Sequence, residues 1–285
     1  MNTSANYPER LVDLMNIGFI GAGGNMARAL IHCANNSVLK NGGKLYLSSR
    51  TLEKLSDYEK NGAVICKSNA DVVLNCDYIF LCVKPQILPS VLDEIKVVAA
   101  HDKCFVSIAA GVSIDSIKFA LGFDAKVIRA MPNTPLLVSA GASALCTNSP
   151  VTESDFSLVK SVFDFGGAAV SVDESQMDAV TAVSGSGPAY FYRFIKNIAK
   201  SGEALGLTYD DSLKLALSTA LGSCKMIGEY ANSDADLQQL IDNVTSPNGT
   251  TYAALCSFDE TGFDKSVCDA LTACYNRSKE LGSGK

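Results

Sequence analysis

Histidine is scarce in this sequence, since His32 and His101 are the only two among its 285 residues. No H-E-x-x-H arrangement and no obvious carboxylate-rich cluster occurs, so we expect no metal site. The ten cysteines are scattered and form no C-x-x-C pair, and we expect them to be reduced thiols in the core. These absences favour a reaction that a bound cofactor performs with little help from side chains, such as hydride transfer.

Long apolar segments are also missing. No apolar run reaches the roughly 18 residues needed to cross a bilayer, and residues 1–16 carry acids where a signal peptide needs an apolar stretch. We therefore expect a soluble cytoplasmic protein. The formal net charge of −6 leaves no basic excess for binding nucleic acid or an anionic membrane surface.

The composition and length predict two folded domains. Hydrophobic residues make up 47% of the chain and charged residues 19%, which is typical of a globular protein. In the first part, short β-rich runs alternate with amphipathic segments expected to be helical at residues 25–34, from about 51, near 70 and at 153–165. The strand-like runs are IGFIG, KLYLSS, AVIC, YIFLCV, CFVSIAAGV, KVIRAM, GASALC and AAVSV.

This alternation predicts a parallel sheet with helices on both faces, an α/β Rossmann-like doubly wound domain over residues 1–172. Residues 173–285 predict an all-helical domain, because a 3.6-residue periodicity runs through 189–205, 213–230, about 250–257 and 264–281. Gly206 is placed for a helix C-cap, and Pro188 and Pro247 for the start of a helix. These helices have more apolar surface than one small core buries, so we expect a dimer.

A glycine-rich turn follows the first strand, in the run IGFIGAGGNMARAL. Its glycines allow the backbone to approach a pyrophosphate, and free N–H groups at the start of the next helix would meet the charge. The turn therefore predicts a dinucleotide site. It is one residue longer than a strict G-x-G-x-x-G, because Met26 and Ala27 stand where the last glycine belongs, and Ala27 is small enough to serve in helix–strand packing.

The second strand ends in Ser48, Ser49 and Arg50, where an NAD enzyme offers an acidic residue to the ribose hydroxyls. Serines beside a guanidinium suit a 2′-phosphate instead, so the pattern favours NADPH, with NADH still possible. The alternative is that Arg50 is an ordinary solvent-facing arginine at a helix start.

Other strand ends supply candidate ligand residues at the same edge of the sheet. Residues 83–86 (VKPQ) include Lys84, which could equally be a surface lysine. Residues 107–111 (SIAAG) are small enough to permit close approach by the nicotinamide half of the cofactor. Residues 131–135 (MPNTP) form a rigid turn with polar side chains.

Two loops of the helical part place small hydroxylated residues ahead of a helix with proline at its start. They are residues 184–190 (SGSGPAY) and 244–252 (VTSPNGTTY). Backbone N–H groups at such helix starts attract a carboxylate. Helix capping alone would also explain either loop.

Taken together, GFIGAGGNMA, VKP, SIAAGV, RAMPNTP, AVSGSGPAY and DNVTSPNGTTYAAL resemble the pyrroline-5-carboxylate reductases, in the right order and over nearly the whole chain. The last two motifs are particular to that family. The resemblance implies NADPH-dependent reduction of pyrroline-5-carboxylate to L-proline, with the substrate bound at a dimer interface made by the helical domains. The resemblance also implies that dimers assemble further, often into decamers.

The resemblance also implies roles for individual residues. Thr251 would be the catalytic residue, with its hydroxyl facing the ring nitrogen. The implied substrate-binding residues are Glu174, Asn243, Ser246, Gly249, Thr250 and Thr251, of which Glu174 is the weakest. The implied cofactor-binding residues are Ile20, Gly21, Ala22, Gly23, Gly24, Asn25, Met26, Ser49, Arg50, Asn69, Val83, Lys84, Pro85, Ala109, Ala110 and Gly111.

Two departures from the family pattern stand out. The glycine-rich loop is one residue longer than the family pattern, which leaves open which backbone N–H group meets which phosphate. Asn248 stands where the family's SPGGTT has glycine, and we expect the turn to survive because asparagine tolerates a left-handed backbone.

The mechanism implied by the resemblance is mainly positioning, because a protonated cyclic imine accepts hydride without an enzyme base. Thr251 would then orient the substrate more than titrate. Two other functions stay open. A 3-hydroxyacid dehydrogenase would use a catalytic lysine, for which Lys196 and Lys200 are available, and a non-catalytic dinucleotide sensor would need no second anion site.

Overall fold

The computed structural model describes residues 15–40 and 42–282, so the expectation about a signal peptide falls almost wholly outside the described residues. The chain forms two compact units. One comprises the described residues up to Ser186 together with those from Cys274 onward, and the other is Gly187–Ala273. The domain boundary after residue 172 stays a prediction. Residues beyond it belong with the first unit because the side chain of Met177 is buried in that unit's core.

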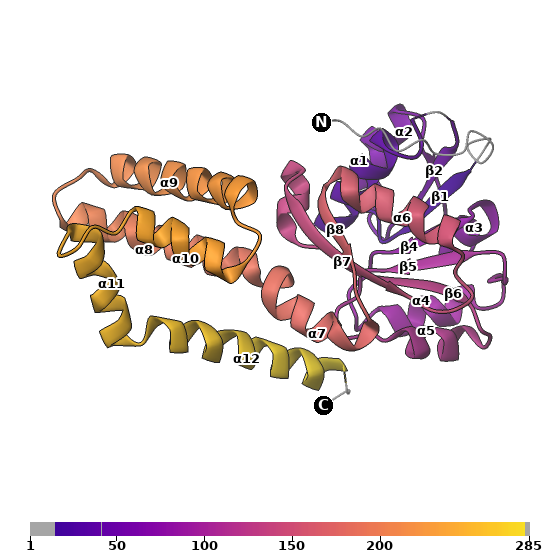
Figure 1. Ribbon diagram of the computed structural model, residues 1–285. Coiled ribbons are helices and arrows are strands. Elements are labelled where there is room, and N and C mark those ends of the chain that lie inside the picture. Colours follow the sequence, from indigo (N-terminus) through magenta and orange to yellow (C-terminus); the bar gives the residue numbers. More distant parts are fainter. Residues whose placement is uncertain (1–14, 41, 283–285) are drawn as a thin grey trace. The chain divides into compact units, whose positions relative to one another are not determined.

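An eight-stranded sheet forms the centre of the first unit (Figure 1). Its strand order is β3-β2-β1-β4-β5-β6-β7-β8, which begins with the 3-2-1-4-5-6 order of dinucleotide-binding folds. The strands are β1 Asn16–Ile20, β2 Lys44–Ser48, β3 Val64–Ile65, β4 Tyr78–Leu81, β5 Cys104–Ser107, β6 Lys126–Met131, β7 Gly141–Thr147 and β8 Gly167–Ser171. The predicted Rossmann-like α/β class is confirmed.

One strand departs from the expected parallel arrangement. Strand β7 pairs antiparallel with β6, whereas every other pair in the described sheet is parallel. Only residues 132–140, with a short 3₁₀ turn over Thr134–Val138, connect the two strands. A parallel crossover needs about a dozen residues or more, so after this short connection β7 can only run antiparallel to β6.

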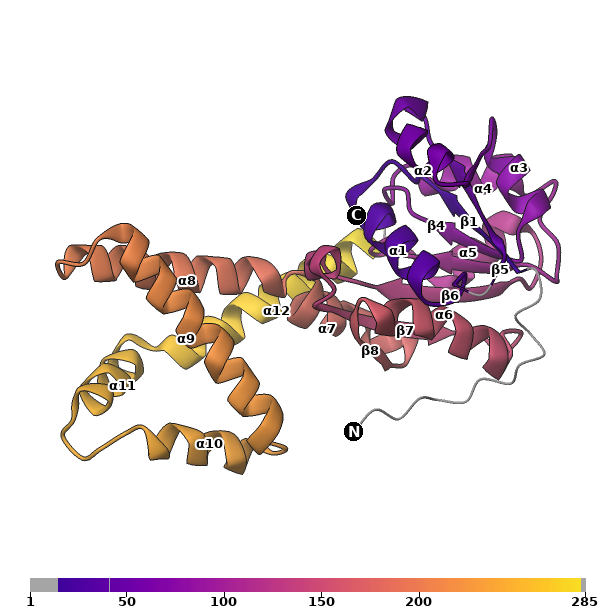
Figure 2. The ribbon, with the colours of Figure 1, turned by 90° about the horizontal axis from the view of Figure 1, so that it is seen from above.

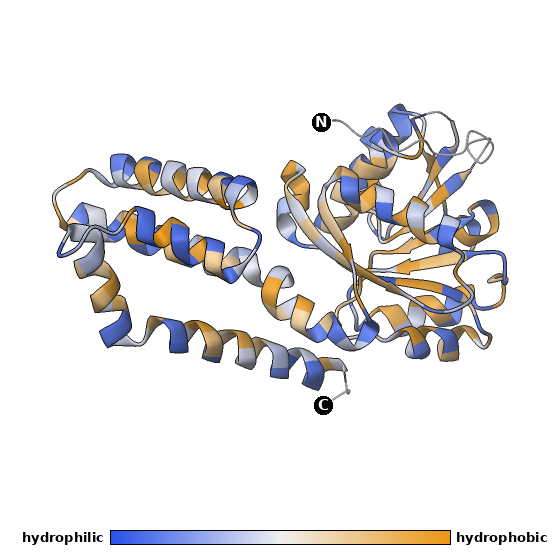
Figure 3. Ribbon diagram, in the orientation of Figure 1, coloured by the Kyte–Doolittle hydropathy of each residue, from blue (hydrophilic) through white to orange (hydrophobic). Residues whose placement is uncertain are grey.

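Two apolar clusters cover the two faces of the sheet. One joins the sheet to α1 (Asn25–Asn36) and α6 (Glu153–Phe165), with Leu30 and Phe163 fully buried. The other joins it to α3 (Asn69–Asn75), α4 (Leu88–Ile95) and α5 (Ile114–Leu121). The two sets of helices lie on opposite sides of the sheet in Figure 1, and the strands between them are predominantly apolar in Figure 3.

The second unit is helical, as the periodicity predicts. It contains α8 (Gly187–Ala204), α9 (Tyr209–Tyr230), α10 (Asp234–Asn243), α11 (Thr250–Thr261) and the first part of α12 (Phe263–Gly282). Helix α9 crosses α8 (Figure 2), and the two approach closely because their contact is made of small residues. Ala199 and Ser212 are buried there, and a side chain at Gly202 would overlap Ser212.

Some helix ends match expectation and others do not. Gly206 follows α8 with φ +104°, the left-handed conformation predicted for a C-cap. Pro188 lies in the first turn of α8, as expected. Pro247 does not start a helix, because α11 begins at Thr250 with Gly249 as its N-cap. Helix α10, which the sequence analysis did not predict, is short and has no buried residue.

Large apolar side chains are exposed throughout the second unit, and Figure 3 shows apolar residues along its helices. Phe191, Tyr192 and Tyr230 are each 62% exposed, and Leu215 and Leu221 are each 58% exposed. Large apolar side chains exposed in such number favour an association face on this unit. No described helix combines the length and apolar character needed to span a membrane.

The cysteines are free thiols, and several are buried in the first unit, including Cys33, Cys76 and Cys146. Burial raises the pKa of Cys33 and of Cys146 to about 11, so both stay protonated at neutral pH. Cys224 and Cys268 are exposed, against the expectation of core positions for all ten.

Candidate functional site

The glycine-rich loop forms a tight turn at the carboxyl end of β1. Gly21 has φ +84°, and a Cβ there would lie 2.8 Å from the carbonyl oxygen of Cys82 and 2.8 Å from Val83. Ser48 at the end of β2 accepts hydrogen bonds from the N–H groups of Gly21 (3.0 Å) and Ala22 (2.9 Å). Glycine is therefore required at position 21 by conformation and by space.

Helix α1 begins directly after this turn and leaves backbone donors available. Gly24 is its N-cap and uses its own N–H on the Gly21 carbonyl oxygen. The N–H groups of Gly23, Asn25, Met26 and Ala27 have no hydrogen-bond acceptor among the described residues. Such a row of donors at a helix start, with the helix dipole behind it, has the geometry of a phosphate cradle.

The loop after β2 adjoins the cradle. A Cβ on Gly23 would lie 2.8 Å from the Ser49 hydroxyl and 3.4 Å from Cδ of Lys54. Arg50 is exposed beside them, while Ser49 Oγ accepts from Thr51 N (3.2 Å). A hydroxyl and two cationic residues thus lie in the segment that adjoins the start of α1. Lys54, in the 3₁₀ turn over Leu52–Leu55, was not among the predicted residues, and its place shortly after Arg50 is the signal that could have revealed it.

Asn69 is held in a defined orientation at the start of α3. Its Oδ1 accepts from the Ser48 hydroxyl (2.7 Å), and its Nδ2 donates to Glu94 (2.6 Å). Glu94 on α4 also accepts from the Asn69 backbone N–H (3.1 Å). Glu94 is a second residue that the motifs did not reveal, because only the fold brings α4 to the start of α3.

Two further loops leave the same edge of the sheet. Strands β1, β4 and β5 are adjacent and parallel, with Ile20, Leu81 and Ser107 aligned in one row. The loops that follow them carry residues 21–24, 83–85 and 108–111 respectively. Val83 contacts Gly21, Ala109 is buried, and Gly111 has φ +75°. The predicted cofactor residues thus gather at one edge, where ligands of this fold bind.

The second unit carries the predicted substrate loop between α10 and α11. Gly249 donates its N–H to the Ser246 carbonyl oxygen (3.0 Å), and a side chain at Gly249 would overlap the Ser246 hydroxyl. Among the described residues, the N–H groups of Thr250 and Thr251 have no acceptor. These two donors and the Ser246 hydroxyl remain available to an anion.

Asn248 adopts φ +56°, the left-handed conformation that glycine normally supplies. The turn therefore survives the departure from SPGGTT, as expected. Asn243, at the end of α10, accepts from Gln239 Nε2 (3.0 Å) through its side-chain oxygen. Its amide nitrogen has no partner among the residues that the structure describes.

Glu174 and Asn133 lie in the first unit and already have partners there. Glu174 accepts from Ile114 N (2.8 Å) and pairs with Arg129 (3.2 Å). Asn133 accepts from Ala142 N (2.9 Å) and donates to the Ser184 carbonyl oxygen (3.0 Å), so this buried amide connects the MPNTP turn to the SGSGPAY segment. The start of that segment lies within a π-helical turn over Thr181–Gly185, a form frequent at functional sites.

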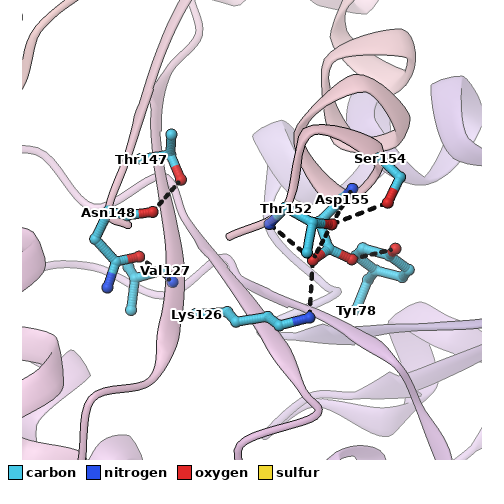
Figure 4. Close-up of polar contacts among 8 residues, drawn as sticks. All are labelled: Tyr78, Lys126, Val127, Thr147, Asn148, Thr152, Ser154 and Asp155. Carbon is cyan, nitrogen blue, oxygen red and sulfur yellow. Dashed lines mark hydrogen bonds and ion pairs between the residues drawn. The ribbon is translucent and has the colours of Figure 1, made fainter. Parts of the chain in front are cut away.

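A polar network occupies the opposite edge of the sheet, where β4 and β6 begin (Figure 4). Asp155 accepts from the Tyr78 hydroxyl, from Lys126 and from the Thr152 hydroxyl, each at 2.8 Å. Burial raises the pKa of Asp155, but the hydrogen bonds from Lys126, Thr152 and Tyr78 more than offset this, so the pKa lies below its usual value. The network joins α6 to the sheet and lies away from the cofactor edge.

No group of three or more histidine, cysteine or acidic residues gathers in metal-binding geometry within the described part of the chain. Both histidine rings pack against phenylalanines, His32 on Phe165 and His101 on Phe123.

Comparison with known proteins identifies the family. A family model described as pyrroline-5-carboxylate reductase dimerisation matches residues 174–281, and one described as NADP oxidoreductase, coenzyme F420-dependent, matches residues 16–111. The pyrroline-5-carboxylate reductase of Pseudomonas aeruginosa is 39% identical over 267 residues, covering 93% of this chain and 96% of that protein. The chain belongs to the pyrroline-5-carboxylate reductase family. The resemblance drawn from the motifs is thereby confirmed.

Solved structures of the family agree. The pyrroline carboxylate reductase of Plasmodium falciparum, with NADP bound, has a TM-score of 0.81 at 34% identity and covers 94% of this chain and 98% of its own. The Coxiella burnetii pyrroline-5-carboxylate reductase has a TM-score of 0.84 at 35% identity, with 94% and 99% covered. The chain that carries the glycine-rich loop and the SPNGTT loop is thus similar in sequence and fold to proteins named pyrroline-5-carboxylate reductases.

Proposed function

We propose that this protein is a pyrroline-5-carboxylate reductase that uses NADPH to reduce the cyclic imine to L-proline. The observation that carries the proposal is the row of free N–H donors at Gly23 and at residues 25–27, beside the Ser49, Arg50 and Lys54 side chains. This arrangement fits a dinucleotide phosphate with an additional 2′-phosphate. Family membership supplies the substrate.

The protein's own residues would bind and orient the cofactor. The α1 donors would hold the pyrophosphate, and Ser49 and Arg50 the 2′-phosphate, while Asn69 would contact the adenosine ribose. The loops at residues 83–85 and 109–111 would enclose the remainder. When bound, NADPH supplies the hydride.

The substrate carboxylate would be held by Ser246 and by the N–H groups of Thr250 and Thr251. Hydride transfer requires the reacting atoms to approach to roughly 3 to 3.5 Å, so the anchoring of the carboxylate sets the reaction geometry. The Thr251 hydroxyl would donate to or accept from the ring nitrogen and so orient the ring. Asn243 is proposed as a further substrate contact.

The exposed apolar faces of the second unit support self-association as a dimer through this domain. A decamer built from such dimers and a cytoplasmic location are included in the proposal, as the family pattern and the sequence suggest.

The decisive assay is NADPH oxidation with pyrroline-5-carboxylate, run in parallel with NADH and with a 3-hydroxyacid plus NADP. We expect turnover with the imine and a preference for NADPH. Turnover with the hydroxyacid alone would instead assign a dehydrogenase, and tight NADPH binding without any turnover would assign a sensor.

A further inference from the structure

A buried arginine lies one strand beyond the cofactor loops. Arg129 on β6 is aligned with Ser107 on β5, in the row that also contains Leu81 and Ile20. Its side chain is only 9% exposed. Burying a cation is costly unless the cation is paired, so Arg129 requires a negatively charged partner at this edge of the sheet.

That partner is Glu174, which has two simultaneous contacts through one oxygen. Oε1 lies 3.2 Å from the Arg129 guanidinium and accepts the Ile114 N–H at 2.8 Å. Ile114 is the first residue of α5, where the helix dipole favours a negative charge. The carboxylate therefore joins β6 to the start of α5.

The loop that Glu174 restrains is the one expected to enclose the nicotinamide. Between β5 and α5 the backbone has few bonds of its own, among them Ala109 N to Ser107 Oγ at 3.3 Å. The end of α12 provides a second restraint, because Gly282 packs against Gly111 and the Ser278 hydroxyl donates to Asp178 at 2.6 Å. Glu174 thus holds the end of this loop at Ile114, and the end of α12 contacts the loop at Gly111.

We propose that Glu174 is a positioning residue for the nicotinamide half of the cofactor, acting through Arg129 and the start of α5, and not a contact for the substrate. The inference rests on the proposed function. The negative charge of Glu174 agrees with this role, because the proposed substrate is itself a carboxylate and would be repelled by an acidic neighbour. The two electropositive partners of Glu174 belong to the cofactor-binding unit.

The test compares Glu174→Gln and Arg129→Met with Glu153→Gln, a matched control on the first turn of α6. Binding of NADPH and of 2′,5′-ADP, which lacks the nicotinamide, is measured by titration without substrate. In both test variants we expect NADPH affinity to fall roughly five- to twentyfold, the effect of losing one charge-assisted hydrogen bond. Affinity for 2′,5′-ADP should stay within about twofold, because the adenosine half is bound elsewhere at the sheet edge.

Thermal unfolding of each variant, measured alongside, shows whether the protein is folded at the assay temperature. A loss of affinity for both ligands in a folded variant would indicate general disturbance and overturn the proposal. Unchanged NADPH affinity with a raised KM for pyrroline-5-carboxylate would make Glu174 a substrate contact, which also overturns it. Since the binding arm needs no turnover, a wild-type protein that binds NADPH without reducing the imine would refute the proposed function and leave this test intact.

Discussion

Asp155 provides the sharpest test of what holds the sheet and α6 together. Its side chain is 13% exposed and that of its partner Lys126 is 22% exposed. Replacing Asp155 by asparagine removes the charge that Lys126 faces and weakens the bond from Tyr78. Breaking a fully buried pair costs about 3–5 kcal/mol. Because Lys126 reaches some solvent, we expect the free energy of unfolding to fall by about 2–3 kcal/mol.

The pH dependence of this effect has a definite sign. The pKa of folded Asp155 lies below its usual value, despite burial, because of its hydrogen bonds with Lys126, Thr152 and Tyr78. The stabilisation is therefore complete above the unfolded pKa of about 3.9 and is lost as pH falls towards the folded value. The difference between wild type and Asp155→Asn should be constant near neutrality and shrink below about pH 4.

Urea unfolding, followed by circular dichroism from pH 3 to pH 8, measures this difference. Asp57→Asn is the control, since the Asp57–Lys60 pair is exposed at 88% and 75% and should contribute nothing measurable. An Asp155→Asn variant as stable as wild type at pH 7, or a difference that grows on acidification, would refute the reasoning.

Three further predictions concern the proposed reaction. Arg50→Ala should weaken NADPH binding roughly tenfold or more while NADH binding stays nearly constant, and an unchanged cofactor preference would exclude the 2′-phosphate role. Thr251→Ala should lower kcat/KM about tenfold with NADPH affinity intact, and equal turnover would remove its orienting role. Gly21→Ala should lower the unfolding free energy by at least roughly 1–2 kcal/mol, because φ is +84° there, and should also weaken NADPH binding; full retention of both properties would contradict the required turn.

The sequence alone was sufficient for the alternation of strands and helices, the glycine-rich turn and the helical second half. These features are local, because periodicity, glycine placement and proline placement are written in neighbouring residues. It was insufficient for the direction of β7, which depends on how few residues separate β7 from β6 in the folded chain. It was also insufficient for α10, which buries no side chain.

The partners of single side chains depended on the tertiary structure. The contact of Glu94 with Asn69 joins α4 to α3, and that of Glu174 with Arg129 spans 45 residues of chain. No local pattern encodes such pairs, since they exist only once distant elements pack against the same sheet. The sequence by itself determined that a glycine-rich turn and a separate loop with free backbone donors are present, because both depend on short-range backbone chemistry. Only the folded chain decided which carboxylate, arginine and lysine lie around the cofactor loops, because those distances are set by the packing of the whole first unit.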